Sequence, residues 1–125
     1  MEYMDFAVIG LDHVQIAIPE NGEQAARDFF SGILGWAELE KPANLRAKGG
    51  AWFQCGAHQV HVGLEKSFIP ARKAHPAILI RNIAAYRSFL ESRGLKPRDE
   101  DVLPGASRFY LDDPFGNRLE FVEWL

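Results

Sequence analysis

The sequence predicts an α+β fold in which two βαβββ modules form a cup-shaped mixed β-sheet with helices on its outer face. Two observations lead to this prediction. Strand-like and helix-like segments follow the same order in both halves of the chain. The strand-like segments also alternate, with aliphatic side chains on one face and small or polar ones, including three of the four histidines, on the other.

The first module covers about residues 9–65. Its first strand is predicted over residues 11–18, where β-branched and other apolar residues alternate with polar or small ones. An apolar stripe at helical spacing then predicts a helix from about Glu23 that ends at Gly35. Three short strands are expected next, at residues 36–39, 51–55 and 59–64, with turns at residues 47–50 and 55–58.

The second module covers about residues 75–125 and follows a linker at residues 66–74. A strand is predicted over residues 75–80, and Asn82 is a suitable N-cap for a helix that ends at Gly94. Further strands are expected near residues 96–98, 108–111 and 118–124. Residues 112–117 are rich in turn formers and predict the hairpin connection between the last two strands.

Size and composition indicate a single small domain over residues 1–125, because 125 residues with 47% hydrophobic content are enough for one core. The net charge of −3, with both signs scattered, argues against non-specific binding to nucleic acid or to anionic membranes. The single cysteine, Cys55, excludes an internal disulfide and a cysteine-based metal cage. The segment Met1–Val8 lacks the basic start and long apolar run of a signal peptide, so we expect a cytoplasmic protein.

Strand parity places the candidate metal ligands on one face of the sheet. Successive side chains of a strand point to opposite faces, and the aliphatic set of each strand suits cover by the helices. The other set includes His13, His61, His75 and Glu120. Neutral imidazole with carboxylate is a common ligand set for a divalent metal, so a metal site inside the cup is expected. The alternative for each single histidine is a structural residue satisfied by hydrogen bonds.

Three segments resemble a known family. They are Leu-Asp-His-Val-Gln-Ile-Ala-Ile at residues 11–18, Phe-Phe-Ser-Gly-Ile-Leu-Gly-Trp at residues 29–36 and Asp-Pro-Phe-Gly-Asn-Arg-Leu-Glu-Phe at residues 113–121. With these motifs, nearly the whole chain resembles the vicinal oxygen chelate superfamily. This superfamily includes glyoxalase I, fosfomycin-resistance and bleomycin-resistance proteins, and extradiol dioxygenases.

The resemblance implies one metal ligand in the first strand of each module and a glutamate in the last strand, and these positions match His13, His75 and Glu120. Glyoxalase I takes a fourth ligand, usually a carboxylate, from the last strand of the first module. His61 stands at that position here, which departs from the glyoxalase I pattern. Family members often pair modules across a twofold axis, so we also expect a homodimer, in which one metal would take ligands from two chains.

The resemblance further implies a divalent metal ion (Zn, Ni, Mn, Co or Fe) that chelates adjacent oxygens of a small-molecule substrate. The expected activity is that of a lyase, isomerase or transferase, with Glu120, Glu65 or a bound water as proton carrier. Two alternatives stay open. One is a non-catalytic protein that binds a drug or metabolite, as bleomycin-resistance proteins do. The other is an Fe(II) extradiol-type dioxygenase.

Four further residues are candidates for substrate binding. Arg108 and Tyr110 share a face of the penultimate strand, where an arginine fork suits an anionic group, although a surface ion pair is an equal alternative. Gln15 shares the face of His13 in the first strand. Trp52 lines either the cup or the core, depending on the register of its strand. His58 lies in an expected turn and is interpreted as an exposed bystander.

Overall fold

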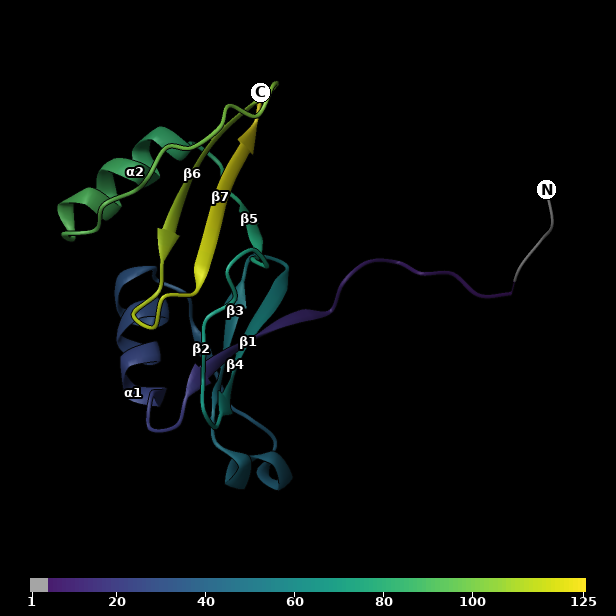
Figure 1. The fold of residues 1–125 in the computed structure, drawn as a ribbon. Helices are drawn as coiled ribbons and strands as arrows, with labels where there is room; N and C mark the ends of the chain where they lie inside the picture. The colour runs from purple at the N-terminus through teal and green to yellow at the C-terminus, as the bar shows by residue number, and fades with distance from the viewer. Residues whose placement is uncertain (1–4) are drawn as a thin grey trace.

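The computed structural model of the protein describes residues 5–125 and confirms an α+β fold of two modules (Figure 1). The first four residues of the segment Met1–Val8 therefore lie outside the described residues. The first module contains β1 (His13–Pro19), α1 (Glu23–Ala26), the π-helix η1 (Arg27–Ile33), β2 (Glu38–Leu39), the 3₁₀-helix η2 (Ala43–Lys48), β3 (Ala51–Cys55) and β4 (His58–Glu65). The second contains β5 (Ala77–Leu79), α2 (Ile83–Ser92), β6 (Ala106–Asp112) and β7 (Arg118–Trp124).

The two modules repeat one strand order. The first forms a four-stranded sheet in the order β1-β4-β3-β2, and the second a three-stranded sheet in the order β5-β7-β6. The first strand of each module runs parallel to the last, and the remaining pairs are antiparallel. The prediction of a strand near residues 96–98 is wrong, because this segment forms only an isolated bridge from Arg98 to Tyr110. Pro97 has no N–H to donate, which shortens the pairing at this edge.

The helices largely follow the expected ranges. The first begins at Glu23, but from Arg27 it widens into a π-helix, and the N–H of Leu34 donates to the carbonyl of Phe29. Asn82 caps α2, since its side chain accepts a hydrogen bond from the N–H of Ala85. The 3₁₀-helix η2 was not expected, because its residues carry no apolar stripe. No helix in residues 5–125 is long and apolar enough to cross a membrane.

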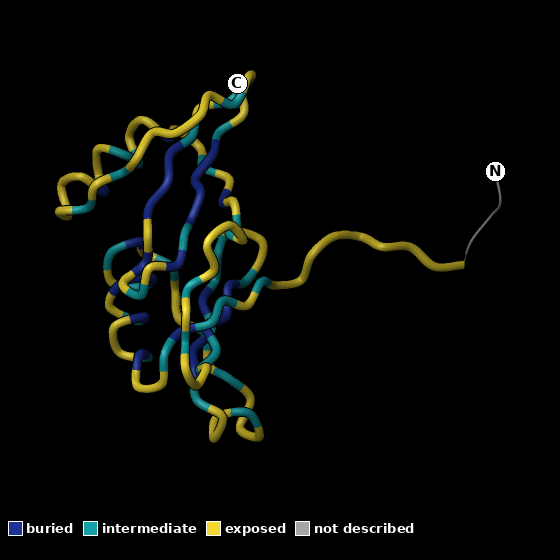
Figure 2. The backbone as a smooth tube through the Cα atoms, viewed as in Figure 1, coloured by how far each residue is buried: buried dark blue, intermediate teal, exposed yellow. Residues whose placement is uncertain are grey.

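The core lies between the helices and one face of each sheet. Figure 1 shows α1 and α2 on the same side of the strands, and Figure 2 shows buried backbone concentrated in those strands. The largest fully buried side chains are Phe30, Phe53, Phe109, Phe121, Ile18, Leu90 and Leu119. Every strand residue in that list belongs to its strand's apolar set, so the parity assignment is confirmed for these strands. Because Phe53 faces the core, Trp52 faces the opposite, polar side.

A buried asparagine joins the two modules. The side-chain NH₂ of Asn117, at the start of β7, donates to the carbonyl of Ala17 in β1 and to the carboxylate of Asp113, both at 2.8 Å. Asp113 in turn accepts from the backbone N–H groups of Phe115 and Asn117. The turn between β6 and β7 is thereby fixed against β1, the strand that begins with His13.

Candidate functional site

Three aromatic rings stack side by side on the polar face of the first sheet. The ring of His61 in β4 lies between His13 in β1 and Trp52 in β3, with centroid distances of 4.1 Å on both sides and interplanar angles of 16° and 5°. The register explains the stack, because β4 pairs with β1 on one side and places His61 directly opposite Trp52 on the other. His61 is buried and His13 is partly exposed at the sheet edge.

His13 presents one ring nitrogen to the polar side of the sheet. Its Nδ1 lies 2.9 Å from a carboxylate oxygen of Asp12, which can only accept a hydrogen bond when ionised. The Nδ1–H of His13 therefore points to Asp12, and Nε2 is the ring nitrogen left for another partner. A carboxylate behind the histidine is the arrangement that orients imidazole ligands in metal sites.

His61 differs from His13 in its hydrogen bonding. Its Nε2 lies 2.8 Å from Oε1 of Gln59, two residues earlier in the same strand. Burial lowers the pKa of His61, and the nearby charges of His13 and Lys41 lower it further, against a smaller opposing effect of Asp12. His61 is therefore a neutral ring near pH 7, held by the stack and by Gln59.

The second module brings His75 and Glu120 together. The Nδ1 of His75, just before β5, lies 2.7 Å from the backbone carbonyl of Lys73, so this nitrogen donates. Its Nε2 lies 2.9 Å from Oε1 of Glu120, in the middle of β7. A neutral imidazole that donates through Nδ1 has a lone pair on Nε2, and a lone pair and a carboxylate repel each other. An imidazole nitrogen and a carboxylate oxygen thus face each other at 2.9 Å, and both are ligand types for a divalent cation.

Glu120 is nearly buried and surrounded by donors. Burial alone would raise the pKa of Glu120, but hydrogen bonding from His75 and the charge of Arg108 outweigh it, so the pKa lies below its usual range. The Nη1 of Arg108 is 3.4 Å from the other carboxylate oxygen. Tyr110, opposite Glu120 in β6, packs its ring edge-on against His75. Glu120 is therefore an ionised carboxylate near pH 7.

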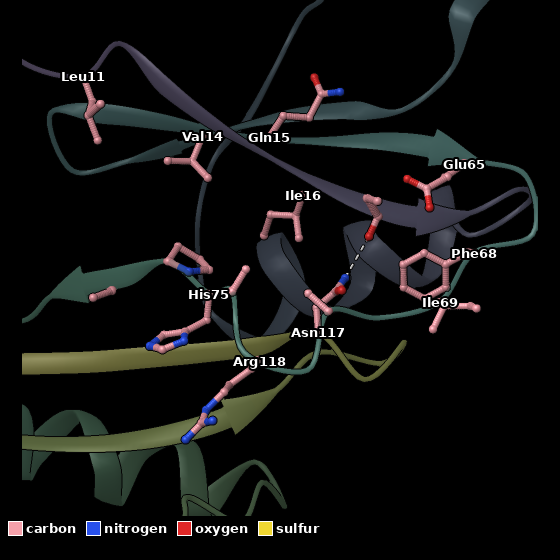
Figure 3. Close-up of a pocket in the computed structure, with 15 residues that line it drawn as sticks. Leu11, Val14, Gln15, Ile16, Glu65, Phe68, Ile69, His75, Asn117 and Arg118 are labelled. Atoms are coloured by element: carbon pink, nitrogen blue, oxygen red, sulfur yellow. Dashed lines mark hydrogen bonds between the residues drawn. The ribbon is translucent and has the colours of Figure 1, made fainter.

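The His13–His61 pair and the His75–Glu120 pair do not come together within the described residues of one chain. In residues 5–125, no three His, Cys, Asp or Glu side chains are arranged to hold a metal ion. His13 and His61 lie on the first module, and His75 and Glu120 on the second. A cavity of about 670 Å³ separates the edges of the modules, with Val14, Gln15 and Ile16 on one side and His75 and Arg118 on the other (Figure 3). Each module thus carries two of the four candidate ligands predicted from the sequence.

The candidate substrate-binding residues divide in the same way. Trp52 and Gln15 line a second cavity of about 710 Å³ over the polar face of the first sheet, together with His13 and His61. Arg108 lies beside Glu120, and its guanidinium also donates to the carbonyl of Asp101. The carboxylate that pairs with Arg108 is thus the nearly buried Glu120, and not one on the surface.

Three further residues considered in the sequence analysis, Tyr110, Glu65 and His58, belong to neither the His13–His61 pair nor the His75–Glu120 pair. The ring of Tyr110 is covered by the guanidinium of Arg118, at 4.2 Å. Glu65, at the end of β4, lines the cavity between the modules. His58 is exposed, as expected, but it is the first residue of β4, opposite Cys55, and does not lie in the turn.

Several residues of the site escaped the sequence reasoning. Asp12 directly precedes His13 in the sequence, and this adjacency could have indicated that its carboxylate bonds the His13 ring. The contacts of Gln59 with His61 and of the Lys73 carbonyl with His75 depend on side-chain rotation, which no pattern reveals. Lys41 and Lys48 line the cavity over the first sheet because η2 folds over that face, and η2 itself had no sequence signal.

Comparisons with known proteins agree with this architecture. The family model described as the Glyoxalase/Bleomycin resistance protein/Dioxygenase superfamily matches residues 10–121. A crystal structure from Bacillus anthracis, described as a glyoxalase family protein, is 41% identical with a TM-score of 0.93, over 98% of this chain and 100% of that chain. Among curated proteins, none matches the chain.

More distant structures share the fold. The fosfomycin resistance protein FosX from Listeria monocytogenes, solved with Mn(II) and 1S,2S-dihydroxypropylphosphonic acid, is 14% identical with a TM-score of 0.76, over 95% of each chain. A glyoxalase/dioxygenase from Nostoc punctiforme is 23% identical with a TM-score of 0.69, over 89% of each chain. On the match of the family model and the 41% identity over 98% of its length, the chain belongs to the glyoxalase/bleomycin resistance protein/dioxygenase superfamily, the vicinal oxygen chelate superfamily.

Proposed function

We propose that this protein is a metal-dependent enzyme of the glyoxalase-like class, acting as a lyase, isomerase or transferase on a small molecule with two adjacent oxygens. The observation that carries the proposal is the matched orientation of two imidazoles. His13 and His75 each donate through Nδ1, to a carboxylate and to a backbone carbonyl, and each directs Nε2 away from that partner. Histidines that bind metals usually donate their other ring N–H to a carboxylate or a backbone carbonyl in this way.

The proposed ligands are His13, His75 and Glu120, which suit a borderline divalent ion. The lone pair with which an imidazole would hold an ion lies in the plane of its ring. Because the rings of His61 and His13 are stacked almost parallel at 4.1 Å, their in-plane lone pairs do not converge on one point. We therefore place His61 beside the ion, as a support for His13, and not among its ligands.

We further propose that each site is completed by a second copy of the chain. His13 of one subunit would then meet the His75 and Glu120 positions of the other, giving a homodimer with two equivalent sites. The separation of the two half-sites within one chain supports this arrangement. The FosX structure with Mn(II), which has the same fold, supports a divalent ion as the cofactor.

When bound, such an ion supplies Lewis acidity that stabilises negative charge developing on the chelated oxygens. The chain's own residues supply the rest. Arg108 and His75 keep Glu120 ionised, so its carboxylate is available as a ligand and, when displaced, as a proton acceptor. Asp12 and the Lys73 carbonyl hold the two imidazoles in the tautomer that offers Nε2.

Metal content tests the proposal. Protein purified and dialysed against a divalent metal should retain about one ion per chain, as measured by elemental analysis. His75→Ala and Glu120→Ala should both lose this ion. His58→Ala is the matched control, because this exposed histidine faces no other ligand candidate, and it should retain the ion. Unchanged metal content in His75→Ala and Glu120→Ala would refute the site.

A further inference from the structure

The loop between β2 and β3 folds over the polar face of the first sheet and supplies two lysines to its cavity. Lys41, Leu45, Lys48 and Gly49 line this cavity of about 710 Å³ opposite the histidine stack. These residues flank or belong to η2, so the loop forms one wall, and β1, β3 and β4 form the floor. The two lysine ammonium groups therefore belong to the same cavity as the proposed ligand His13.

Close packing holds this wall in place. A Cβ atom added at Gly50 would lie 2.3 Å from the carbonyl oxygen of Val62, and one at Gly49 would lie 2.6 Å from the side chain of Leu64. The N–H of Gly50 also donates to Glu23 at 2.9 Å, and the Lys41 ammonium donates to the Gly49 carbonyl. The backbone of the loop is thus pressed directly against β4. The backbone that carries the two lysines is therefore held at the cavity rim.

The charges on the two sides of the loop differ. In a separate cavity on the other side of the loop, which Lys41 also lines, Arg27 is paired with Glu38 and Arg46 with Glu40. Within residues 5–125, neither Lys41 nor Lys48 has a carboxylate within ion-pair distance. The single acid that lines the cavity, Asp12, is itself exposed and bonded to His13. The cavity therefore has unbalanced positive charge.

The arginine that the sequence suggested for an anionic group is already occupied. Arg108 donates to Glu120 and twice to the carbonyl of Asp101, so three of its five N–H donors already have partners within the chain. A lysine ammonium has three donors on a flexible stem and acts as a compact point charge. Lys41 retains two of its donors beyond the Gly49 carbonyl, and Lys48 makes no hydrogen bond among the described residues.

We propose that Lys41 and Lys48 bind an anionic group of the substrate, a carboxylate, phosphate or phosphonate, that lies apart from the two chelated oxygens. This inference rests on the proposed function and narrows its substrate class to anionic oxygen chelators. The anion sits against the η2 wall, while the chelating oxygens lie over His13. The positive cavity also attracts such a substrate from solution, and this attraction weakens as salt rises.

Two probes that differ by one charged group test the inference on the metal-loaded protein. Glycerate carries a vicinal hydroxyl and carboxylate, and phosphoglycerate has the same pair plus a phosphate on the terminal carbon. Calorimetric titration should show that Lys48→Met weakens phosphoglycerate binding by roughly tenfold, the loss of one charge-assisted contact, and leaves glycerate binding within about twofold. Lys41→Met should act in the same direction. Lys96→Met removes an exposed lysine of the second module that lines neither cavity, and it should change neither.

The outcomes separate the two proposals. Phosphoglycerate binding that is unchanged in both lysine variants overturns the anion site. So does an equal loss of both probes, which would mean that the lysines only hold the loop. Titration of the metal-free protein with inorganic phosphate gives an independent arm, in which wild type should bind more tightly than Lys48→Met. If this difference appears while no metal is retained, the anion site stands and the proposed function fails.

Discussion

Replacing Asn117 by alanine tests the link between the two modules. The variant loses two hydrogen bonds from one buried side chain, to the Ala17 carbonyl and to the Asp113 carboxylate, both 2.8 Å long (Figure 3 draws the first). A neutral hydrogen bond contributes about 1 kcal/mol net, and one to a charged group about 2 kcal/mol. The free energy of unfolding should therefore fall by about 3 kcal/mol.

The loss should depend on pH through Asp113. Burial raises the pKa of Asp113, and hydrogen bonds from Asn117 and from the backbone N–H of Phe115 oppose that rise. Without the Asn117 side chain the pKa rises further, so more free energy is needed to keep the buried carboxylate ionised. A raised carboxyl pKa in the folded state makes stability fall as pH rises from the unfolded value through the folded one. The variant should therefore lose more stability at pH 7 than at pH 4.

Urea unfolding at both pH values measures these changes. Asn44→Ala is the matched control, because Asn44 is exposed in η2 and makes no side-chain hydrogen bond among the described residues. It should stay within about 0.5 kcal/mol of wild type. A loss below about 1 kcal/mol for Asn117→Ala, or a loss that grows toward acidic pH, would refute the reasoning.

Two further changes test the loop and the second half-site. Gly50 has a φ of +84°, and a Cβ added there would meet the carbonyl oxygen of Val62. Gly56 also has a positive φ, +57°, but a Cβ added there would meet open space. Gly50→Ala should therefore lower the free energy of unfolding by at least about 2 kcal/mol more than Gly56→Ala. Equal thermal unfolding of the two variants would contradict this. Glu120 has a lowered pKa, so its contribution to stability is present above about pH 4.5 and is lost as pH falls. Metal-free wild type should therefore lose stability below pH 4.5 more steeply than Glu120→Gln, and parallel curves would count against the His75–Glu120 pair.

Much of the fold was predictable because the alternation of apolar and polar residues shows which side chains share a face of a strand. The alternation in β4 and β7 separated His61 and Glu120 from the core side chains, and the structure confirms that separation. The range of β3 was predicted correctly, but the sequence left open which side of the sheet Trp52 faces. A one-residue shift in register exchanges the two faces of a strand, and only the pairing with the neighbouring strands decides which face is buried.

The rest depended on interactions without a sequence pattern. The π-helical turn from Arg27 keeps the same apolar stripe as an α-helix, so periodicity does not distinguish the two. The wall formed by η2 arises from close contact of Gly49 and Gly50 with β4, which requires the folded loop. Likewise, alternation places His13 and His75 on polar faces but does not say whether the two side chains meet.

A mixed dimer tests the shared metal site most directly. Chains with His13→Ala and chains with Glu120→Ala, carrying different tags, are co-expressed, and the heterodimer is purified and analysed for metal. If each site takes His13 from one subunit and Glu120 from the other, one of the two sites keeps all its ligands, and the heterodimer should hold about one ion while both homodimers hold none. A heterodimer without metal, beside a wild type that binds it, would contradict the shared site.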